Sequence, residues 1–173
     1  AGADGVVIGS LNADGTLNTE QMQEMMEAAG SCAVTMHRAF DVCADPFEAL
    51  KKSAELGVDT ILTSGQEADC LAGCGLLKKL VQLTDQNWSD SRRVTILAGA
   101  GVTSANIAEI AKKTGVRAFH MSGKRLLESG MRYRNERVHM GLGSLSEFEC
   151  YRTDEAEIRR AAEILRTLGE DGR

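Results

Sequence analysis

Short apolar runs alternate along this chain with longer segments in which apolar residues recur every three or four positions. Short runs rich in β-branched residues are typical of buried strands, whereas the longer spacing is that of one face of a helix. Five strands and five helices are therefore predicted. The strands lie within residues 2–9, 33–39, 57–64, 94–97 and 115–122. The helices span residues 18–29, 46–56, 75–84, 103–114 and 154–168.

Three of the five strands begin with the same short phrase. A glycine is followed by small or charged residues and then by an apolar run, and the phrases that start at Gly2, Gly57 and Gly115 superimpose without gaps. Glycine takes the left-handed conformation that ends a helix without steric cost. We interpret each phrase as a joint at which one helix ends and the next strand begins.

Residues with helix-start chemistry stand at the beginning of the predicted helices. Asn18 and Thr103 are N-cap types, and Pro46 sits where a first-turn proline is tolerated. Asp154 and Glu157 have the spacing of a capping box. The helix boundaries are thus predicted independently of the hydrophobic pattern.

Alternating strands and helices predict a parallel sheet, because each crossover returns the chain to the same edge. Five such units fit either an open flavodoxin-like sheet or the last five βα units of a TIM (β/α)₈ barrel. In two strands the apolar set alternates with polar residues, which places His37 and His120 on the face opposite the apolar one. Strands that carry polar side chains inward near their carboxyl ends favour the barrel.

The composition narrows the class of protein. A chain of 173 residues with 43% hydrophobic residues is expected to form a single domain. The net charge of -5 and the lack of a long Lys/Arg run argue against nucleic-acid or membrane partners. The five cysteines are odd in number and widely spread, which predicts thiols in a reducing compartment, the cytoplasm with the nucleus as a second location.

Several motifs at the strand ends resemble the CutC copper-homeostasis family. They cover the chain in order and lie at residues 37–41 (His-Arg-Ala-Phe-Asp), 62–67 (Leu-Thr-Ser-Gly-Gln-Glu), 99–102 (Gly-Ala-Gly-Val), 119–122 (Phe-His-Met-Ser) and 140–141 (Met-Gly). The resemblance implies a complete TIM barrel of about 250 residues, whose first three strands precede this chain. It also implies Cu(I) binding and copper tolerance as the function, and residues 128–141 resemble the eukaryotic branch.

The chain departs from that family at two places. The loop after the fourth strand is Ala98-Gly99-Ala100-Gly101 where the family usually has Pro-Gly-Gly-Gly. Cys70 and Cys74 stand where the family has apolar residues, and the cysteines proposed to bind copper in eukaryotic members belong to the upstream portion. The resemblance therefore gives this segment no copper ligand of its own.

The first candidate site follows the second strand. His37, Arg38 and Asp41 lie where barrel enzymes keep catalytic groups, and together they could bind an anion or move a proton. The alternative is that Arg38 and Asp41 form a structural ion pair and that His37 satisfies a buried polar position.

Further candidates end the third and fifth strands. Ser64 and Glu67 bring a hydroxyl and a carboxylate to the same rim, although a turn with a helix cap explains them as well. His120 and Ser122 would face His37 across a closed barrel and complete a polar pocket, the alternative being a core histidine.

An anion site is expected after the fourth strand. Gly99, Gly101 and Thr103 lead into a helix N-terminus, where backbone N–H groups favour an anion, and Lys124 follows the next strand. The alternative is a tight turn whose glycines only allow close packing.

The metal ligands of the chain are not identified by its sequence. Cu(I) prefers sulfur ligands, so Cys70 and Cys74 are the candidates, although Gly73 and Gly75 argue against a helix that would align their thiols. Three function classes stay open: copper handling, an enzyme for a small phosphorylated or anionic substrate, and an interaction module. Since five units leave two sheet edges unpaired, a homo-oligomer is also expected.

Overall fold

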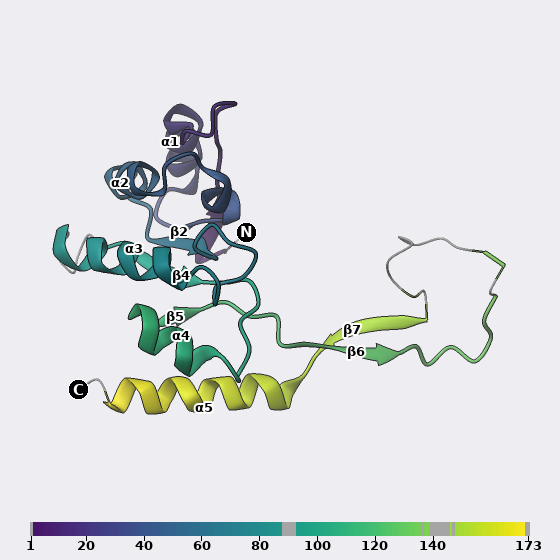
Figure 1. Ribbon diagram of the computed structural model, residues 1–173. Helices are drawn as coiled ribbons and strands as arrows, with labels where there is room; N and C mark the ends of the chain where they lie inside the picture. The colour runs from purple at the N-terminus through teal and green to yellow at the C-terminus, as the bar shows by residue number, and fades with distance from the viewer. Residues whose placement is uncertain (1, 88–92, 136, 139–145, 147, 172–173) are drawn as a thin grey trace.

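A five-stranded parallel sheet forms the centre of the molecule (Figure 1). The structure is a computed structural model and describes the chain except for residues 1, 88–92, 136, 139–145, 147 and 172–173. The strands are β1 (Gly5–Ile8), β2 (Ala33–Met36), β3 (Thr60–Thr63), β4 (Thr95–Ala98) and β5 (Ala118–Phe119). All five predicted strands are confirmed, and each is shorter than the apolar run or phrase that predicted it, apart from β4, which is shifted by one residue.

The order of the strands decides between the two predicted architectures. They are hydrogen-bonded in the order β1-β2-β3-β4-β5, so each strand lies beside its neighbour in sequence. A flavodoxin-like sheet has a point at which the strand order reverses, whereas a TIM barrel has none. The fold is therefore α/β of the TIM-barrel type, with five consecutive βα units.

Helices follow the strands as predicted. They are α1 (Thr19–Ala29), α2 (Pro46–Leu56), α3 (Cys74–Asn87), α4 (Ile107–Thr114) and α5 (Glu155–Asp171). The prediction for α4 began four residues too early, because the side chain of Asn106 accepts the N–H of Thr103 and holds residues 103–106 in a turn. The joints behave as expected, since Gly57 and Gly115 end α2 and α4 with φ of 87° and 78°.

The core lies between one face of the sheet and its helices. Met36, Ile61 and Ile96 are register partners across β2, β3 and β4 on this face and are buried. The Ser53 hydroxyl of α2 donates to the sulfur of Met36, so α2 covers this face of the sheet at β2. Burial of such a side chain contributes about 1.5–3 kcal/mol. On the opposite face Val7 is 63% exposed.

A β-ribbon that was not predicted projects from the body. It consists of β6 (Lys124–Glu128) and β7 (Glu149–Thr153), which pair antiparallel and connect β5 to α5 (Figure 1). Charged residues at the ends of both strands hid them from a search for apolar runs. Among the helices that the structure describes, none has the length and apolar character needed to cross a membrane.

Candidate functional site

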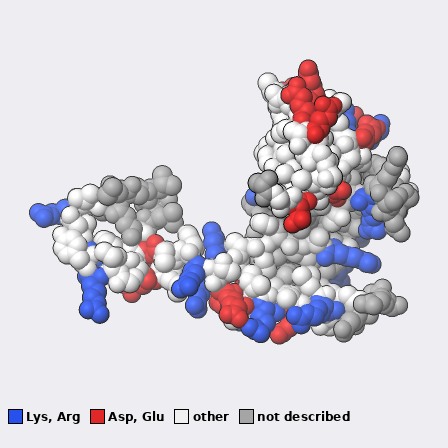
Figure 2. Space-filling view, turned by 180° about the vertical axis from the view of Figure 1, so that it is seen from behind, with Lys and Arg blue, Asp and Glu red and all other residues white. Residues whose placement is uncertain are grey.

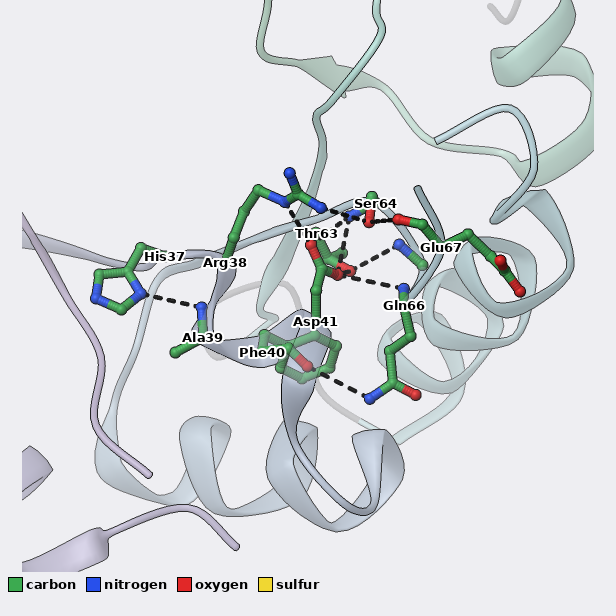
Figure 3. Close-up of polar contacts among 10 residues, drawn as sticks. His37, Arg38, Ala39, Phe40, Asp41, Thr63, Ser64, Gln66 and Glu67 are labelled. Atoms are coloured by element: carbon green, nitrogen blue, oxygen red, sulfur yellow. Dashed lines mark hydrogen bonds and ion pairs between the residues drawn. The ribbon is translucent and has the colours of Figure 1, made fainter. Parts of the chain in front are cut away.

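The carboxylate of Asp41 organises the carboxyl ends of β2 and β3 (Figure 3). It accepts hydrogen bonds from the Thr63 hydroxyl, from the backbone N–H of Ser64 at 3.0 Å and from that of Gln66 at 3.3 Å. The Arg38 Nε donates to its other oxygen at 2.6 Å. Asp41 therefore fastens the turn after β2 to the loop after β3.

A short 3-10 helix, η1 (Arg38–Val42), aims Asp41 at this loop. The predicted strand at 33–39 stops at Met36 because His37 caps η1, its Nδ1 accepting the N–H of Ala39 at 3.1 Å. A 3-10 helix as short as this one leaves no signal in the hydrophobic pattern of the sequence. The sequence placed Asp41 in the loop after the second strand, and the structure adds that η1 directs its carboxylate toward the loop after β3.

Gln66 is the residue of this cluster that sequence reasoning missed. Its backbone has φ of 59°, a left-handed conformation that costs a residue with a side chain about 1–3 kcal/mol. Its side-chain amide donates to the carbonyl of Cys43 at 2.8 Å, while its N–H reaches Asp41. These bonds hold the strained conformation in place.

Asp41 is ionised by its surroundings. Its burial raises the pKa, but hydrogen bonds from Thr63, Arg38, Ser64 and Gln66 favour the charged form and together hold the pKa below the ordinary 3.8. A carboxylate so saturated with donors does not serve as a general base. Its role is to position Arg38, whose Nη2 also donates to the Ser64 hydroxyl at 3.0 Å.

His37 points away from this cluster (Figure 3). Its ring packs against Gly9, where an added Cβ would lie 2.6 Å from the imidazole Cε1. Because Nδ1 accepts the Ala39 N–H, the neutral ring carries its proton on Nε2. His37 acts here as a cap, which agrees with the structural alternative.

A pocket of about 660 Å³ lies at the carboxyl ends of β4 and β5. It gathers six of the predicted site residues: Arg38, His120, Ser122, Gly101, Thr103 and Lys124. Arg125 and Arg160 add two further cations to its wall, and Asp154 and Glu157 add two carboxylates. The pocket therefore combines an excess of positive charge with an imidazole and a hydroxyl.

The remaining predicted residues do not line this pocket. Asp41 and Ser64 accept hydrogen bonds from the guanidinium of Arg38. Glu67 contributes its backbone carbonyl, which accepts the Ser64 hydroxyl at 2.6 Å. Gly99 allows close packing, since a Cβ there would lie 2.5 Å from a methyl of Leu62.

The structure does not bring His37 and His120 together. They follow β2 and β5, which are three strands apart in the sheet, a separation of roughly 14 Å at the usual strand spacing. His37 is also turned toward β1 by its contact with Gly9. A pocket that joins His37, Ser64 and His120 is therefore not formed by the described residues.

The loop after β4 is already occupied by internal acceptors. The Thr103 N–H donates to Asn106 at 2.8 Å, and Ser104 donates its N–H and its hydroxyl to Glu157 at 2.6 and 2.8 Å. The Ser104 N–H, the Arg160 guanidinium and the Ser104 hydroxyl lower the pKa of Glu157. Glu157 was predicted to complete a capping box with Asp154, but it links α5 to the turn that precedes α4 instead.

No three of the cysteines gather into one cluster in the part of the chain that the structure describes. Burial raises the pKa of Cys43 and of Cys70 to about 11, which disfavours the thiolate that binds Cu(I). Cys70 lies in the turn before α3, and the Cys74 thiol donates to its carbonyl at 3.4 Å. Among described residues, no group of three or more His, Cys, Asp or Glu is placed to hold a metal ion.

Comparison with known proteins gives one family. The model of the CutC family matches residues 1–125. The CutC family protein of Bacteroides fragilis is 47% identical over 165 residues, which are 95% of this chain and 63% of the relative. That of Salmonella agona is 41% identical over 165 residues, with the same coverage of both chains. The chain thus spans less than two thirds of the length of these curated relatives.

A solved structure shows the same fold. The crystal structure of CutC from Streptococcus agalactiae, a protein named for copper homeostasis, superimposes with a TM-score of 0.62 at 27% identity. The match covers 69% of this chain and 56% of that one. These named relatives are bacterial, so the resemblance to the eukaryotic branch stays a prediction.

Proposed function

This chain belongs to the CutC family, and from that premise we propose that the protein takes part in copper homeostasis inside the cell, in the cytoplasm with the nucleus as a second location. The observation that carries the proposal is the family match, together with the likeness to a structure named for copper homeostasis. Because the chain spans 63% of the B. fragilis relative, the role is proposed for the whole protein.

In the proposed role copper is the cargo of the protein rather than a resident cofactor. Cu(I) requires soft ligands, and the buried thiols of Cys43 and Cys70 hold their protons at neutral pH. These two cysteines are therefore not proposed as copper ligands.

A competition titration of the full-length protein with a coloured Cu(I) chelator tests this role. We expect the protein to withdraw about one equivalent of Cu(I) from the chelator. The variant Cys70→Ser/Cys74→Ser is the matched control and is expected to bind equally. A full-length protein that withdraws no copper at all would overturn the proposal.

A second candidate function is supported by the pocket. We propose that it binds a small anionic ligand such as a phosphorylated metabolite. Its volume of about 660 Å³ lies in the range of small-molecule sites, and its wall carries Arg38, Lys124, Arg125 and Arg160. The support is this set of cations at the carboxyl ends of parallel strands, where barrel proteins hold phosphate.

The described residues divide the work of such a site. Asp41 and Ser64 fix the guanidinium of Arg38, so that it meets an anion without first losing rotational freedom. His120 can exchange a proton with a bound ligand, and Ser122 offers a hydroxyl beside it. An enzyme at this site would use His120 as its proton-transfer group.

Thermal unfolding in phosphate tests the anion site. At equal ionic strength we expect inorganic phosphate to raise the Tm above that in chloride, by mass action on the folded state. The variant Lys124→Ala should lose that increment. Lys112→Ala removes an equal charge outside the pocket and should keep it. Equal Tm values in phosphate and chloride for the wild-type protein would contradict the proposal.

A further inference from the structure

The carboxylate of Glu157 lies against donors that suit an anionic ligand. Its two oxygens accept the Ser104 N–H at 2.6 Å and the Ser104 hydroxyl at 2.8 Å. The Arg160 guanidinium also donates to it at 2.8 Å. A backbone N–H, a hydroxyl and a guanidinium are the groups with which proteins hold phosphate oxygens. These donors therefore already hold an anion, and that anion is a side chain of the same protein.

The Glu157 side chain covers Ser104 on the side of the pocket. Glu157 and Thr103 line the pocket of about 660 Å³, whereas Ser104, which follows Thr103 in the chain, does not line it. The Glu157 side chain is 20% exposed, so water reaches the carboxylate while it holds Ser104. Movement of this one side chain would open the N–H and the hydroxyl of Ser104 to the pocket.

Glu157 can leave Ser104 without becoming an unpaired buried charge. Its own helix does not require it, because the Asp154 N–H, which a capping box would join to Glu157, donates to the Gly123 carbonyl at 2.8 Å. Arg160 follows three residues later on the same helix and its side chain is 56% exposed. The ion pair of Glu157 and Arg160 can therefore persist in water after Ser104 is released.

Glu157 also opposes the positive charge of the pocket. Figure 2 shows acidic and basic side chains side by side where the β-ribbon meets the start of α5. Arg160, one of the cations of the pocket wall, is paired with Glu157. Hydrogen bonds from Ser104 and Arg160 lower the pKa of Glu157 from its ordinary 4.5, so the carboxylate is charged at neutral pH. An incoming anion therefore meets a like charge until Glu157 gives way.

We propose that Ser104 is an anion-binding residue of this pocket and that Glu157 is an internal competitor, which a phosphate group displaces from Ser104, an inference that rests on the anion site proposed above. The exchange selects the class of ligand. A ligand carboxylate would replace Glu157 by a group of the same charge with the same two oxygens. A phosphate monoester brings about two negative charges and three acceptor oxygens. It can bind Ser104 and the cations Arg38 and Lys124 together, so the ligand is a phosphate monoester rather than a carboxylic acid.

The phosphate affinity of Glu157→Gln tests the competition. Dissociation constants come from the rise in Tm of the full-length protein with inorganic phosphate at constant ionic strength. Glu157→Gln removes the competing charge and should tighten phosphate binding by at least about fivefold. Glu155→Gln is the matched control, because Glu155 lies in the same turn, pairs with Arg159 and does not line the pocket. It should leave the dissociation constant within about twofold of the wild-type value.

A second variant tests whether phosphate takes the donors that Glu157 leaves. In the Glu157→Gln background, Ser104→Ala removes the hydroxyl and should weaken phosphate binding by at least about fivefold, because a hydrogen bond to a charged group is lost. An unchanged affinity would reduce Glu157 to a fixed charge of the wall and would overturn the proposal. Sodium acetate is the carboxylate probe and should raise the wild-type Tm less than phosphate does. An equal rise would overturn the selection of phosphate.

Failure of the competition differs from failure of the anion site. If neither the wild-type protein nor Glu157→Gln responds to phosphate, the pocket is not an anion site and both proposals are wrong. If the wild-type protein responds and Glu157→Gln binds no tighter than Glu155→Gln, the anion site stands and the competition is wrong. Circular dichroism of each variant checks that the fold is retained.

Discussion

Both carboxylate oxygens of Asp41 lie 3.0 Å from the backbone nitrogen of Ser64. The two residues belong to successive βα units, so this contact ties neighbouring loops into one rim. The Arg38 guanidinium, which lines the pocket, is held between them. The stability of the rim and the position of a pocket residue therefore depend on one buried carboxylate.

Replacement of Asp41 by Asn should weaken the fold. The side chain is 6% exposed, and the amide would keep the shape but lose the charge and set a donor against N–H groups. We expect a loss of about 2–4 kcal/mol in the free energy of unfolding, measured by urea denaturation. Glu48→Gln, which removes an exposed carboxylate paired with Lys52, should change it by less than about 0.5 kcal/mol.

The free energy of unfolding should depend on pH in the acid range because Asp41 titrates there. Its folded pKa lies below its ordinary value of 3.8, so its contribution is complete above that value and is lost as pH falls through the folded pKa. Unfolding measured from pH 6 to pH 2 should show this loss. The acid limb should be shallower in Asp41→Asn, and equal slopes in the two proteins would contradict the assignment.

Replacement by alanine should have opposite effects on stability at two glycines that are two residues apart in the chain. A Cβ on Gly73 would overlap the backbone carbonyl of Ser64, whereas a Cβ on Gly75 meets nothing within 4 Å. Gly73→Ala should therefore destabilise the protein by about 3 kcal/mol or more, since backbone must move. Gly75→Ala, in the first turn of α3, should stabilise it by about 0.5 kcal/mol. Thermal unfolding of both variants decides the matter.

Ala100 carries strain that glycine would relieve. Its φ is 72°, a left-handed conformation in which a Cβ costs about 1–2 kcal/mol. Glycine also raises the conformational entropy of the unfolded chain, which offsets part of the relieved strain. Ala100→Gly should therefore raise the free energy of unfolding by about 0.5–1 kcal/mol. The control Ala98→Gly, at a buried strand position, should lower it. A Tm for Ala100→Gly at or below that of the wild type would contradict the inference that Ala100 is strained.

The cysteines should differ in reactivity. Cys150 is exposed, whereas burial raises the pKa of Cys43 and Cys70 to about 11. Since the thiolate is the nucleophile, alkylation at pH 8 should label Cys150 at least tenfold faster than the two buried thiols. Peptide mass spectrometry over time gives the rates. In urea the difference should vanish, and fast labelling of Cys70 in the folded protein would contradict its burial.

Part of the candidate site could be predicted from the sequence. Strand ends are marked by hydrophobic period, so Arg38, His120 and Lys124 could be placed at the carboxyl edge of a parallel sheet. Gln66 and Glu157 could not, because their partners lie 25 and 53 residues away in the chain. Nothing local indicates which donor a carboxylate will meet at such a separation.

The sequence by itself determined the alternation of strands and helices, the glycine joints and the family. These follow from local rules, since period and backbone conformation depend on residues close in the chain. Only the tertiary structure decided that the strands run in chain order, that His37 turns toward β1, and that Glu157 rather than an external anion meets Ser104. Those outcomes are set by which surfaces pack against one another, and packing joins residues that no local pattern relates.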